Sequence, residues 1–239
     1  MKISVAIVGS VVLSLMMVSS CSETPSVSVS PTETPRKMMA GPINYVALGD
    51  STGAGVGARN GGYVARLFSR IKLHRPDATL TNLCVSGATS EDVLRRQLEP
   101  GIRKQPNLIT LGIGINDIGR GISVERFSKN YEQIINRLKN ETSALIVVSN
   151  IPDVSTAPSI PTYVRAEYLR RIVTFNEKLE EIASRHGVEM FDVFNATHQQ
   201  LDSRPELFSA DGFHPSDAGY ELWAELMWPT VAGAIGVDP

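Results

Sequence analysis

The chain of 239 residues is poor in features that would bind nucleic acids. Its 23 Lys and Arg residues are outnumbered by 25 Asp and Glu residues, which gives a formal net charge of -2 at pH 7, and the basic residues form no run. Such a surface has no general attraction for phosphate backbones or anionic lipid headgroups. We therefore expect no nucleic-acid partner.

Cysteine and histidine are also scarce, with two and four residues, respectively. None of the histidines has the spacing of a metal-binding motif such as H-E-x-x-H, and we expect His74, His186 and His198 at solvated helix ends. Cys84 has no neighbouring His or Arg that would stabilise a thiolate, which predicts a small buried apolar residue. Nothing in this composition points to a metal ion or another cofactor.

The N-terminus is largely apolar, with Lys2 before a stretch from Ile3 to Val18. This stretch is shorter than the roughly 20 residues of a membrane-spanning helix, which predicts an export signal over residues 1–20. The segment Val18-Ser19-Ser20-Cys21 resembles the lipobox of bacterial lipoproteins. The resemblance implies that Cys21 is acylated and becomes the mature N-terminus, so that a lipid anchors the protein in the cell envelope. It would then lie on a bacterial membrane, facing outside the cytoplasm.

An uncleaved membrane anchor and a secretory signal cut at another bond are the alternatives to lipidation. In a Gram-negative host, Ser22 after the cysteine resembles the signals that send lipoproteins to the outer membrane. From residue 21 to residue 42, Ser, Thr, Pro and Glu replace most large apolar residues, so this segment cannot bury enough surface to fold. We predict a flexible tether over 21–42 and one globular domain over 43–239.

Short apolar runs alternate with segments of helical period in the predicted domain. The predicted strands are 43–48, 78–85, 108–113, 144–149 and 188–191. The clearest predicted helix has one apolar face made by Val164, Tyr168, Ile172, Phe175, Leu179 and Ile182. A second predicted helix presents Phe127, Tyr131, Ile134 and Leu138 on one face. The alternation predicts an α/β fold, a three-layer α/β/α sandwich with a five-stranded parallel sheet.

Three candidate site residues follow the first three predicted strands. Ser51 follows the first strand, Gly87 the second and Asn116 the third. Ligands of such sheets bind beyond the carboxyl ends of the strands, where the loops converge. We therefore expect these three residues to gather at one rim of the sheet.

Ser51 needs two kinds of partner to act as a nucleophile. A neutral imidazole must accept the hydroxyl proton, and fixed N–H groups must stabilise the oxyanion. Asp211 and His214 are three residues apart, close enough for the carboxylate to accept from Nδ1–H while Nε2 faces Ser51. Taken alone, this pair is more typical of a surface turn before the last helix. Its combination with a serine after the first strand favours a catalytic triad.

Two further carboxylates lie beside these residues. Asp50 is adjacent to Ser51, and neighbouring side chains on extended backbone point to opposite faces, so we expect Asp50 to accept hydrogen bonds from nearby loop amides. Asn116 is a better oxyanion donor than Asp117, because a carboxylate would repel the developing negative charge. Asp117 is therefore predicted to be structural.

Two other motifs overlap Ser51. Residues 49–53 match the G-x-S-x-G elbow of α/β-hydrolases, but that elbow normally lies further into the sheet, with a triad acid far from the histidine. Residues 53–58 match the G-x-G-x-x-A motif of dinucleotide-binding folds. That motif requires an acidic residue at the end of the next strand, where the chain has Asn82-Leu83-Cys84-Val85. We set both motifs aside.

The chain contains, in order, Gly49-Asp50-Ser51, Gly87, Gly114-Ile115-Asn116-Asp117 and Asp211-Gly212-Phe213-His214. From about Ile43 onwards it thereby resembles the SGNH hydrolases of the GDSL esterase/lipase family, with Thr52 replacing the leucine of the family name. The resemblance implies a flavodoxin-like fold. It also implies Ser51 as nucleophile, His214 as base oriented by Asp211, and an oxyanion hole formed by the Ser51 and Gly87 backbone N–H groups and the Asn116 side chain.

The resemblance implies a carboxylic-ester hydrolase that acts on a small-molecule or lipid ester. It does not fix the substrate, because the family covers lysophospholipids, acyl thioesters, simple esters and acetylated sugars. An acyltransferase and a non-catalytic envelope binding module are alternatives, and the intact set of chemical groups disfavours the second. No oligomeric state is indicated. The proline-containing loop from Ile151 to Tyr163 is either a solvated connector or a wall of the acyl site.

Overall fold

The computed structural model describes Met39, residues 41–201 and residues 203–238. The predicted export signal, Cys21 and most of the predicted tether lie outside the described residues. Among the helices of the described part, none is long and apolar enough to cross a membrane.

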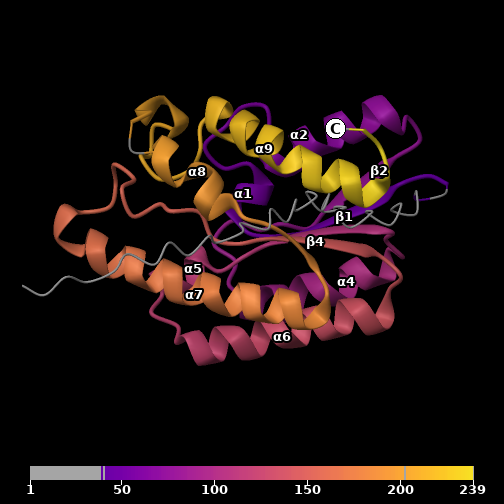
Figure 1. Ribbon diagram of the computed structural model, residues 1–239, viewed down its shortest axis with the longest axis horizontal. Helices are drawn as coiled ribbons and strands as arrows, with labels where there is room; N and C mark the ends of the chain where they lie inside the picture. The colour runs from indigo at the N-terminus through magenta and orange to yellow at the C-terminus, as the bar shows by residue number, and fades with distance from the viewer. Residues whose placement is uncertain (1–38, 40, 202, 239) are drawn as a thin grey trace, which may run out of the picture. The chain divides into compact units, whose positions relative to one another are not determined.

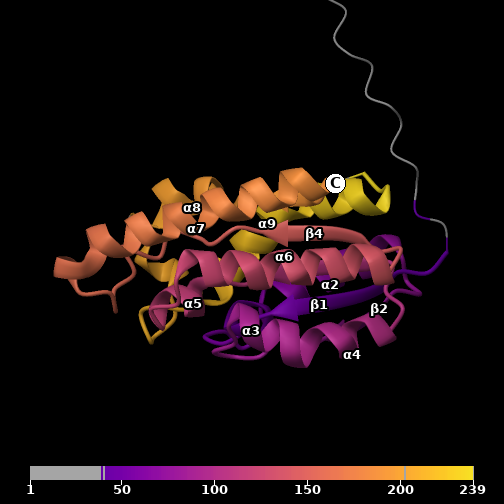
Figure 2. The same cartoon turned by 90° about the horizontal axis from the view of Figure 1, so that it is seen from below.

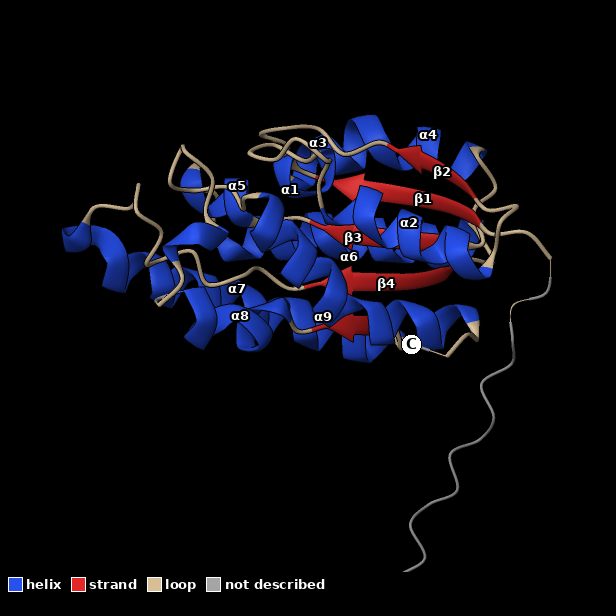
Figure 3. Cartoon of the chain, turned by 90° about the horizontal axis from the view of Figure 1, so that it is seen from above, coloured by secondary structure: helices blue, strands red, loops and turns tan. Residues whose placement is uncertain are grey.

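The described residues form a parallel sheet of five strands, which confirms the predicted fold class. The strands are β1 (Asn44–Gly49), β2 (Thr79–Asn82), β3 (Leu108–Gly112), β4 (Leu145–Ser149) and β5 (Glu189–Phe191). Their order across the sheet is β2-β1-β3-β4-β5, the order of flavodoxin-like folds. All strands point the same way, towards the end of the sheet where α1, α3 and α5 lie (Figure 3).

Four of the five strands begin and end within one residue of the predicted bounds, but β2 is shorter than predicted. It ends at Asn82, whose side-chain amide donates to the Gly53 carbonyl and whose oxygen accepts from the Cys84 N–H. The chain nevertheless stays beside β1, because the N–H groups of Leu83 and Val85 still donate to carbonyls of that strand. The side chain of Asn82 therefore turns the chain without separating it from the sheet.

Helices cover both faces of the sheet. The helices α2 (Tyr63–His74) and α9 (Asp217–Ile235) lie on one face, and α4 (Leu98–Arg103), α6 (Val124–Glu141) and α7 (Arg165–His186) lie on the other (Figure 1). On the second face α6 lies between α4 and α7 (Figure 2). The shorter helices are α1 (Ser51–Ala54), α3 (Ser90–Asp92), α5 (Ile115–Gly119) and α8 (Val193–Leu201), with a π-helix η1 (Val93–Gln97) and 3-10 helices η2 (Thr162–Val164) and η3 (Pro205–Leu207).

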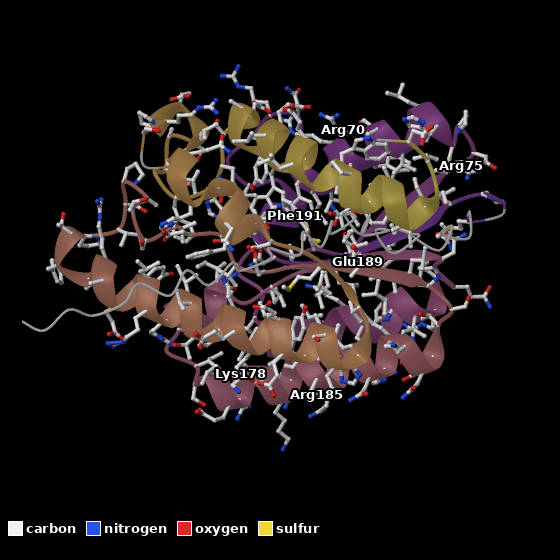
Figure 4. The ribbon with its side chains drawn as sticks, viewed as in Figure 1. Arg70, Arg75, Lys178, Arg185, Glu189 and Phe191 are labelled. Atoms are coloured by element: carbon white, nitrogen blue, oxygen red, sulfur yellow. The ribbon has the colours of Figure 1, made fainter. Side chains whose placement is uncertain are left out.

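The two longest helices on this second face follow the predicted periodicity. In α6 the buried residues Phe127, Tyr131, Ile134 and Leu138 recur at intervals of three and four, and the Ser123 side chain caps the first turn. In α7 the fully buried residues begin at Ile172, Tyr168 is partly buried against the same core, and Val164 belongs to η2. The opposite face of α7 carries Lys178 and Arg185, which point away from the sheet (Figure 4).

Packing between α2 and α9 brings the start of the last helix to the rim of the sheet where the strands end. Tyr63 stacks on Trp223 with ring centroids 5.1 Å apart, and Arg66 pairs with Asp217 at 2.7 Å. The Asp217 carboxylate also accepts from the backbone N–H groups of Arg59 and Asn60, in the loop that follows α1. These contacts fix the position at which the chain enters α9, three residues after His214.

Candidate active site

Ser51 is the first residue of α1 and lies directly beyond the end of β1. Its side chain is almost fully buried, and Asp50 caps the helix by accepting from the Thr52 N–H at 3.0 Å. Gly49 precedes this turn in a left-handed conformation, where a side chain would come within 2.4 Å of the Gly112 carbonyl of β3. The Gln97 side chain holds Gly49 from the other side, with hydrogen bonds of 2.8 Å to both its N–H and its carbonyl. The serine is therefore presented from a rigid turn.

A chain of hydrogen bonds links Ser51 to the loop before α9. His214 Nε2 lies 2.9 Å from Ser51 Oγ, and His214 Nδ1 lies 2.6 Å from Asp211 Oδ2. The other carboxylate oxygen, Oδ1, accepts from the Ser209 hydroxyl and from the N–H groups of Phe213 and His214. Asp211 thus fixes both the imidazole and the backbone that carries it.

Glycine at position 57 lets this loop approach Ser51. Gly57 has a φ of 92°, and a side chain there would lie 2.8 Å from the Pro215 carbonyl and 2.9 Å from His214 Cβ. The Tyr220 hydroxyl donates to the neighbouring Val56 carbonyl at 2.8 Å. Gly57 therefore serves the packing of the histidine loop. The resemblance of residues 53–58 to a dinucleotide motif does not indicate this role.

The two aspartates near His214 have opposite electrostatic environments. Partial burial opposes ionisation of Asp211, but hydrogen bonds from His214, from two backbone N–H groups and from Ser209 lower its pKa overall. Burial raises the pKa of Asp50 to about 6, although hydrogen bonds from Thr52 and the nearby His214 act in the other direction. Asp50 bonds to the amide and hydroxyl of Thr52 rather than to the histidine. The departure from leucine at position 52 thus supplies an extra donor to this carboxylate.

Gly87, in the loop after β2, lies close to Asn116, in the first turn of α5. The Asn116 side-chain amide donates to the Ala88 carbonyl at 2.9 Å, which leaves its second N–H for another acceptor. Within the described part of the chain, the Gly87 N–H has no acceptor, whereas its carbonyl accepts from Arg120 Nη2 at 2.6 Å. Each of the two residues therefore offers an unused N–H group. The assignment of these groups to an oxyanion hole stays a prediction.

Asp117 lies in the interior. Its two oxygens accept from the Ser90 hydroxyl at 2.6 Å and from the Ser90 N–H at 2.9 Å. Burial raises its pKa above the ordinary value, against the effect of these hydrogen bonds. Asp117 thereby ties α5 to the start of α3, close to Gly87 in the chain.

A small, mostly apolar pocket opens beside Ser51 and His214. Its apolar walls include Ile113, Ile115, Ile151, Val154, Phe213 and Trp223. The loop after β4 contributes its first residues to this pocket, and Val154 and Ala157 are buried. Tyr163, at the far end of the predicted loop, is 88% exposed and does not line the pocket. The first half of the loop is therefore packed against the domain, whereas most of residues 158–163 are exposed.

The other histidines lie away from Ser51, near helix ends as predicted, but two of them are not simply solvated. His186 Nε2 lies 2.7 Å from Glu132, and His198 Nδ1 lies 2.7 Å from the buried carboxylate of Asp153. These partners are far apart in the sequence, so no spacing reveals them. Among the described residues, no cluster of three or more His, Cys, Asp or Glu side chains could hold a metal ion.

Cys84 packs where the sequence predicts a small apolar residue. Cys84 is partly buried. A Cβ atom added to Gly53 would lie only 2.4 Å from its Sγ. Burial raises the pKa of the thiol far above its ordinary value. Cys84 therefore contributes to packing under the turn that carries Ser51.

Residues 47–222 match the family of GDSL-like lipases and acylhydrolases. The chain is 27% identical over 206 residues to the GDSL-like esterase Rv1075c of Mycobacterium tuberculosis, a match that covers 81% of this chain and 63% of that protein. It is 23% identical over 188 residues to the esterase TesA of Pseudomonas aeruginosa, covering 78% of this chain and 86% of TesA. The chain thus spans less than two thirds of the length of Rv1075c.

Solved structures share the fold. The acetylxylan esterase Axe2 of Geobacillus stearothermophilus superposes with a TM-score of 0.67 at 20% identity, over 82% of this chain and 95% of that one. A lipase/acylhydrolase from Enterococcus faecalis gives a TM-score of 0.65 at 24% identity, over 80% of this chain and 96% of that one. At these identities the superpositions establish the α/β fold with its parallel sheet.

Proposed function

The chain belongs to the GDSL-like lipase/acylhydrolase family, whose activity is carboxylic-ester hydrolysis, and on this premise we propose that it hydrolyses carboxylic esters through an acyl-enzyme on Ser51. The observation that carries the proposal is the pair of hydrogen bonds from Ser51 to His214 at 2.9 Å and from His214 to Asp211 at 2.6 Å. No cofactor takes part in this mechanism.

In the first step His214 Nε2 accepts the Ser51 proton as Oγ forms a bond to the ester carbonyl carbon. The Nδ1–H donates to Asp211, which selects the required tautomer and stabilises the imidazolium. The lowered pKa of Asp211 keeps this carboxylate ionised at neutral and mildly acidic pH. The negative charge that forms on the carbonyl oxygen is then available for hydrogen bonds from nearby N–H groups.

We assign those bonds to the backbone N–H groups of Ser51 and Gly87 and to the Asn116 side chain. The support is that the Gly87 N–H and one Asn116 N–H have no acceptor within the described part of the chain. When the tetrahedral intermediate collapses, the C–O bond to the alcohol breaks, and His214 gives its proton to the leaving oxygen. A water molecule, deprotonated by the same histidine, then releases the acid and restores Ser51.

The small apolar pocket beside Ser51 suits the acyl group. Its walls suit a short or medium chain, because they consist of a few apolar side chains, among them Phe213 and Trp223, which also line a second small apolar pocket. Each CH₂ group of the acyl chain contributes about 0.8 kcal/mol to binding only if it is buried against the pocket wall. We therefore expect p-nitrophenyl esters of about two to eight carbons to react faster than those of about sixteen. A kcat/KM that rises up to the longest chain would favour a lysophospholipase instead.

The acylation test compares Ser51→Ala with Ser69→Ala, the same change at an exposed position of α2. Ser51→Ala should leave less than about one hundredth of the activity and abolish the burst of acyl-enzyme with an activated ester, whereas Ser69→Ala should retain both. Activity of Ser51→Ala above that level would contradict the proposal. Product analysis with an added alcohol distinguishes hydrolysis from acyl transfer to that alcohol.

We further propose that Cys21 carries a lipid that holds the enzyme in the cell envelope. The support is its position after a short apolar segment and two small residues, in a sequence that resembles a lipobox. Wild-type protein should partition into the detergent phase, and Cys21→Ser should remain unprocessed or appear in the aqueous phase. Equal partitioning of the two proteins would contradict lipidation.

A further inference from the structure

An open groove of about 950 Å³ lies beside Gly87, on the side of the sheet where β2 forms the edge. Its walls include Val85, Gly87, Asp92, Arg96 and Arg120. The catalytic assignment uses only the N–H of Gly87 and leaves the rest of this groove without a role.

Two arginines of the groove retain unused hydrogen-bond donors. Arg120 is exposed, and within the described part of the chain it makes one hydrogen bond, from Nη2 to the Gly87 carbonyl, and no ion pair. A guanidinium has five N–H donors, so most of those of Arg120 are available. Arg96 is 81% exposed at its side chain and lies 3.8 Å from Asp92.

Asp92 reduces the positive charge of the groove but does not cancel it. Its Oδ2 already accepts from the Thr89 N–H and hydroxyl, and these bonds lower its pKa and keep it ionised. Two guanidinium groups thus face one carboxylate. The groove carries a net positive charge in a chain whose overall charge is negative.

The acyl pocket has Ser51 in its wall, whereas the groove comes closest to the proposed catalytic residues at Gly87. The rest of the acyl pocket is formed by residues after β3 and β4 and by the region around His214, and the groove is formed by residues after β2, by η1 and α4, and by Arg120 after α5. The sheet order β2-β1-β3-β4 places Ser51, after β1, between the two hollows. The acyl and alcohol arms of an ester also diverge at the carbonyl carbon. If the hydrocarbon occupies the apolar pocket, the alcohol arm is directed towards the charged groove.

We propose that this groove is a leaving-group subsite that selects esters whose alcohol carries an anionic group, a carboxylate or a phosphate, with Arg120 and Arg96 as the specificity-determining residues. The inference rests on the proposed ester hydrolysis at Ser51. Arginine suits this role because its planar fork of donors matches both anions. Arg120 is the nearer residue to the reacting centre, since it touches Gly87 directly.

The test measures kcat/KM for p-nitrophenyl butanoate and for the same ester with a carboxylate beside the nitro group. A second pair, monobutanoylglycerol and its phosphate, tests the phosphate. For each pair, the ratio of anionic to neutral ester should fall about five- to tenfold in Arg120→Gln and about threefold in Arg96→Gln. Arg120→Lys should recover part of the ratio, and salt at about 0.5 M should reduce the wild-type ratio.

Arg95→Gln is the matched control, because Arg95 is adjacent to Arg96, is 72% exposed at its side chain, pairs with Glu91 and does not line the groove. It should leave both ratios unchanged. Unchanged ratios in Arg120→Gln and Arg96→Gln, or an equal fall in Arg95→Gln, would overturn the subsite. If Arg120→Gln disturbs the backbone at Gly87, kcat/KM for the neutral ester falls as well. The ratio of anionic to neutral ester in Arg96→Gln then tests the subsite. Failure of the wild type to hydrolyse either neutral ester would instead contradict the proposed function, and this inference with it.

Discussion

The domain contains two pairs of aspartate and histidine with nearly the same geometry and different surroundings. In one, His214 Nδ1 lies 2.6 Å from Asp211, and in the other, His198 Nδ1 lies 2.7 Å from Asp153. The first imidazole presents Nε2 to Ser51. The second stacks against Phe194 with ring centroids 5.3 Å apart.

Burial is reversed between the two pairs. The His214 side chain is 19% exposed and the Asp211 side chain 45%, whereas the His198 side chain is 44% exposed and the Asp153 side chain 3%. In the proposed mechanism His214 exchanges a proton with Ser51, and such a base is best shielded from water. The more exposed Asp211 is held by backbone N–H groups. In the second pair the buried carboxylate needs the histidine as a partner. The comparison shows that an aspartate–histidine contact alone does not make an active site.

Replacement of each histidine should give the largest difference in kcat between the two pairs. We expect His214→Gln to lower kcat for an activated ester by at least about 10³-fold, because no other group takes the Ser51 proton. His198→Gln should change kcat by less than about threefold, because this side chain has no contact with Ser51. Steady-state kinetics on the two purified variants decides the matter. Similar losses in both would mean that the second pair also supports catalysis.

Removal of each carboxylate should separate catalysis from stability. Asp211→Ala should reduce kcat by about 10²-fold or more, since the histidine loses both its tautomer selection and its backbone support. Asp153→Ala should cost roughly 1 to 3 kcal/mol of folding free energy, because the buried Ser155 N–H loses its acceptor. Kinetics and urea denaturation of both variants would test this. A kcat loss in Asp153→Ala as large as that in Asp211→Ala would contradict the distinction.

The same comparison shows what the sequence can predict. The Asp211–His214 pair is visible because three residues separate its members in one turn, and the strands are visible as apolar runs. Asp153 and His198 are 45 residues apart and meet only through the fold. The contact of Arg120 with Gly87 likewise joins two loops that spacing does not relate. Local patterns therefore predict the sheet and the turn of the base, whereas partners that meet through tertiary packing leave no signal in one sequence.

Asp50 differs from both aspartates of these pairs. It is a buried carboxylate next to Ser51 that has no histidine as a hydrogen-bond partner. Burial raises its pKa from the ordinary value of 3.8 to about 6. Between these two values the folded state keeps a proton that the unfolded state has lost. The stability that Asp50 contributes at pH below about 4 is therefore lost as the pH rises through about 6.

Replacement by asparagine should remove this pH dependence. In Asp50→Asn the side-chain oxygen can still accept from the amide and hydroxyl of Thr52, and the residue is neutral at every pH. The variant should therefore gain roughly 2 to 3 kcal/mol of unfolding free energy relative to wild type between pH 4 and pH 7, since each pKa unit corresponds to about 1.36 kcal/mol. Asp77→Asn, at an exposed position, serves as the control and should show no such gain. Urea denaturation across this range measures both differences, and a constant difference between Asp50→Asn and wild type would show that burial does not hold the proton on Asp50.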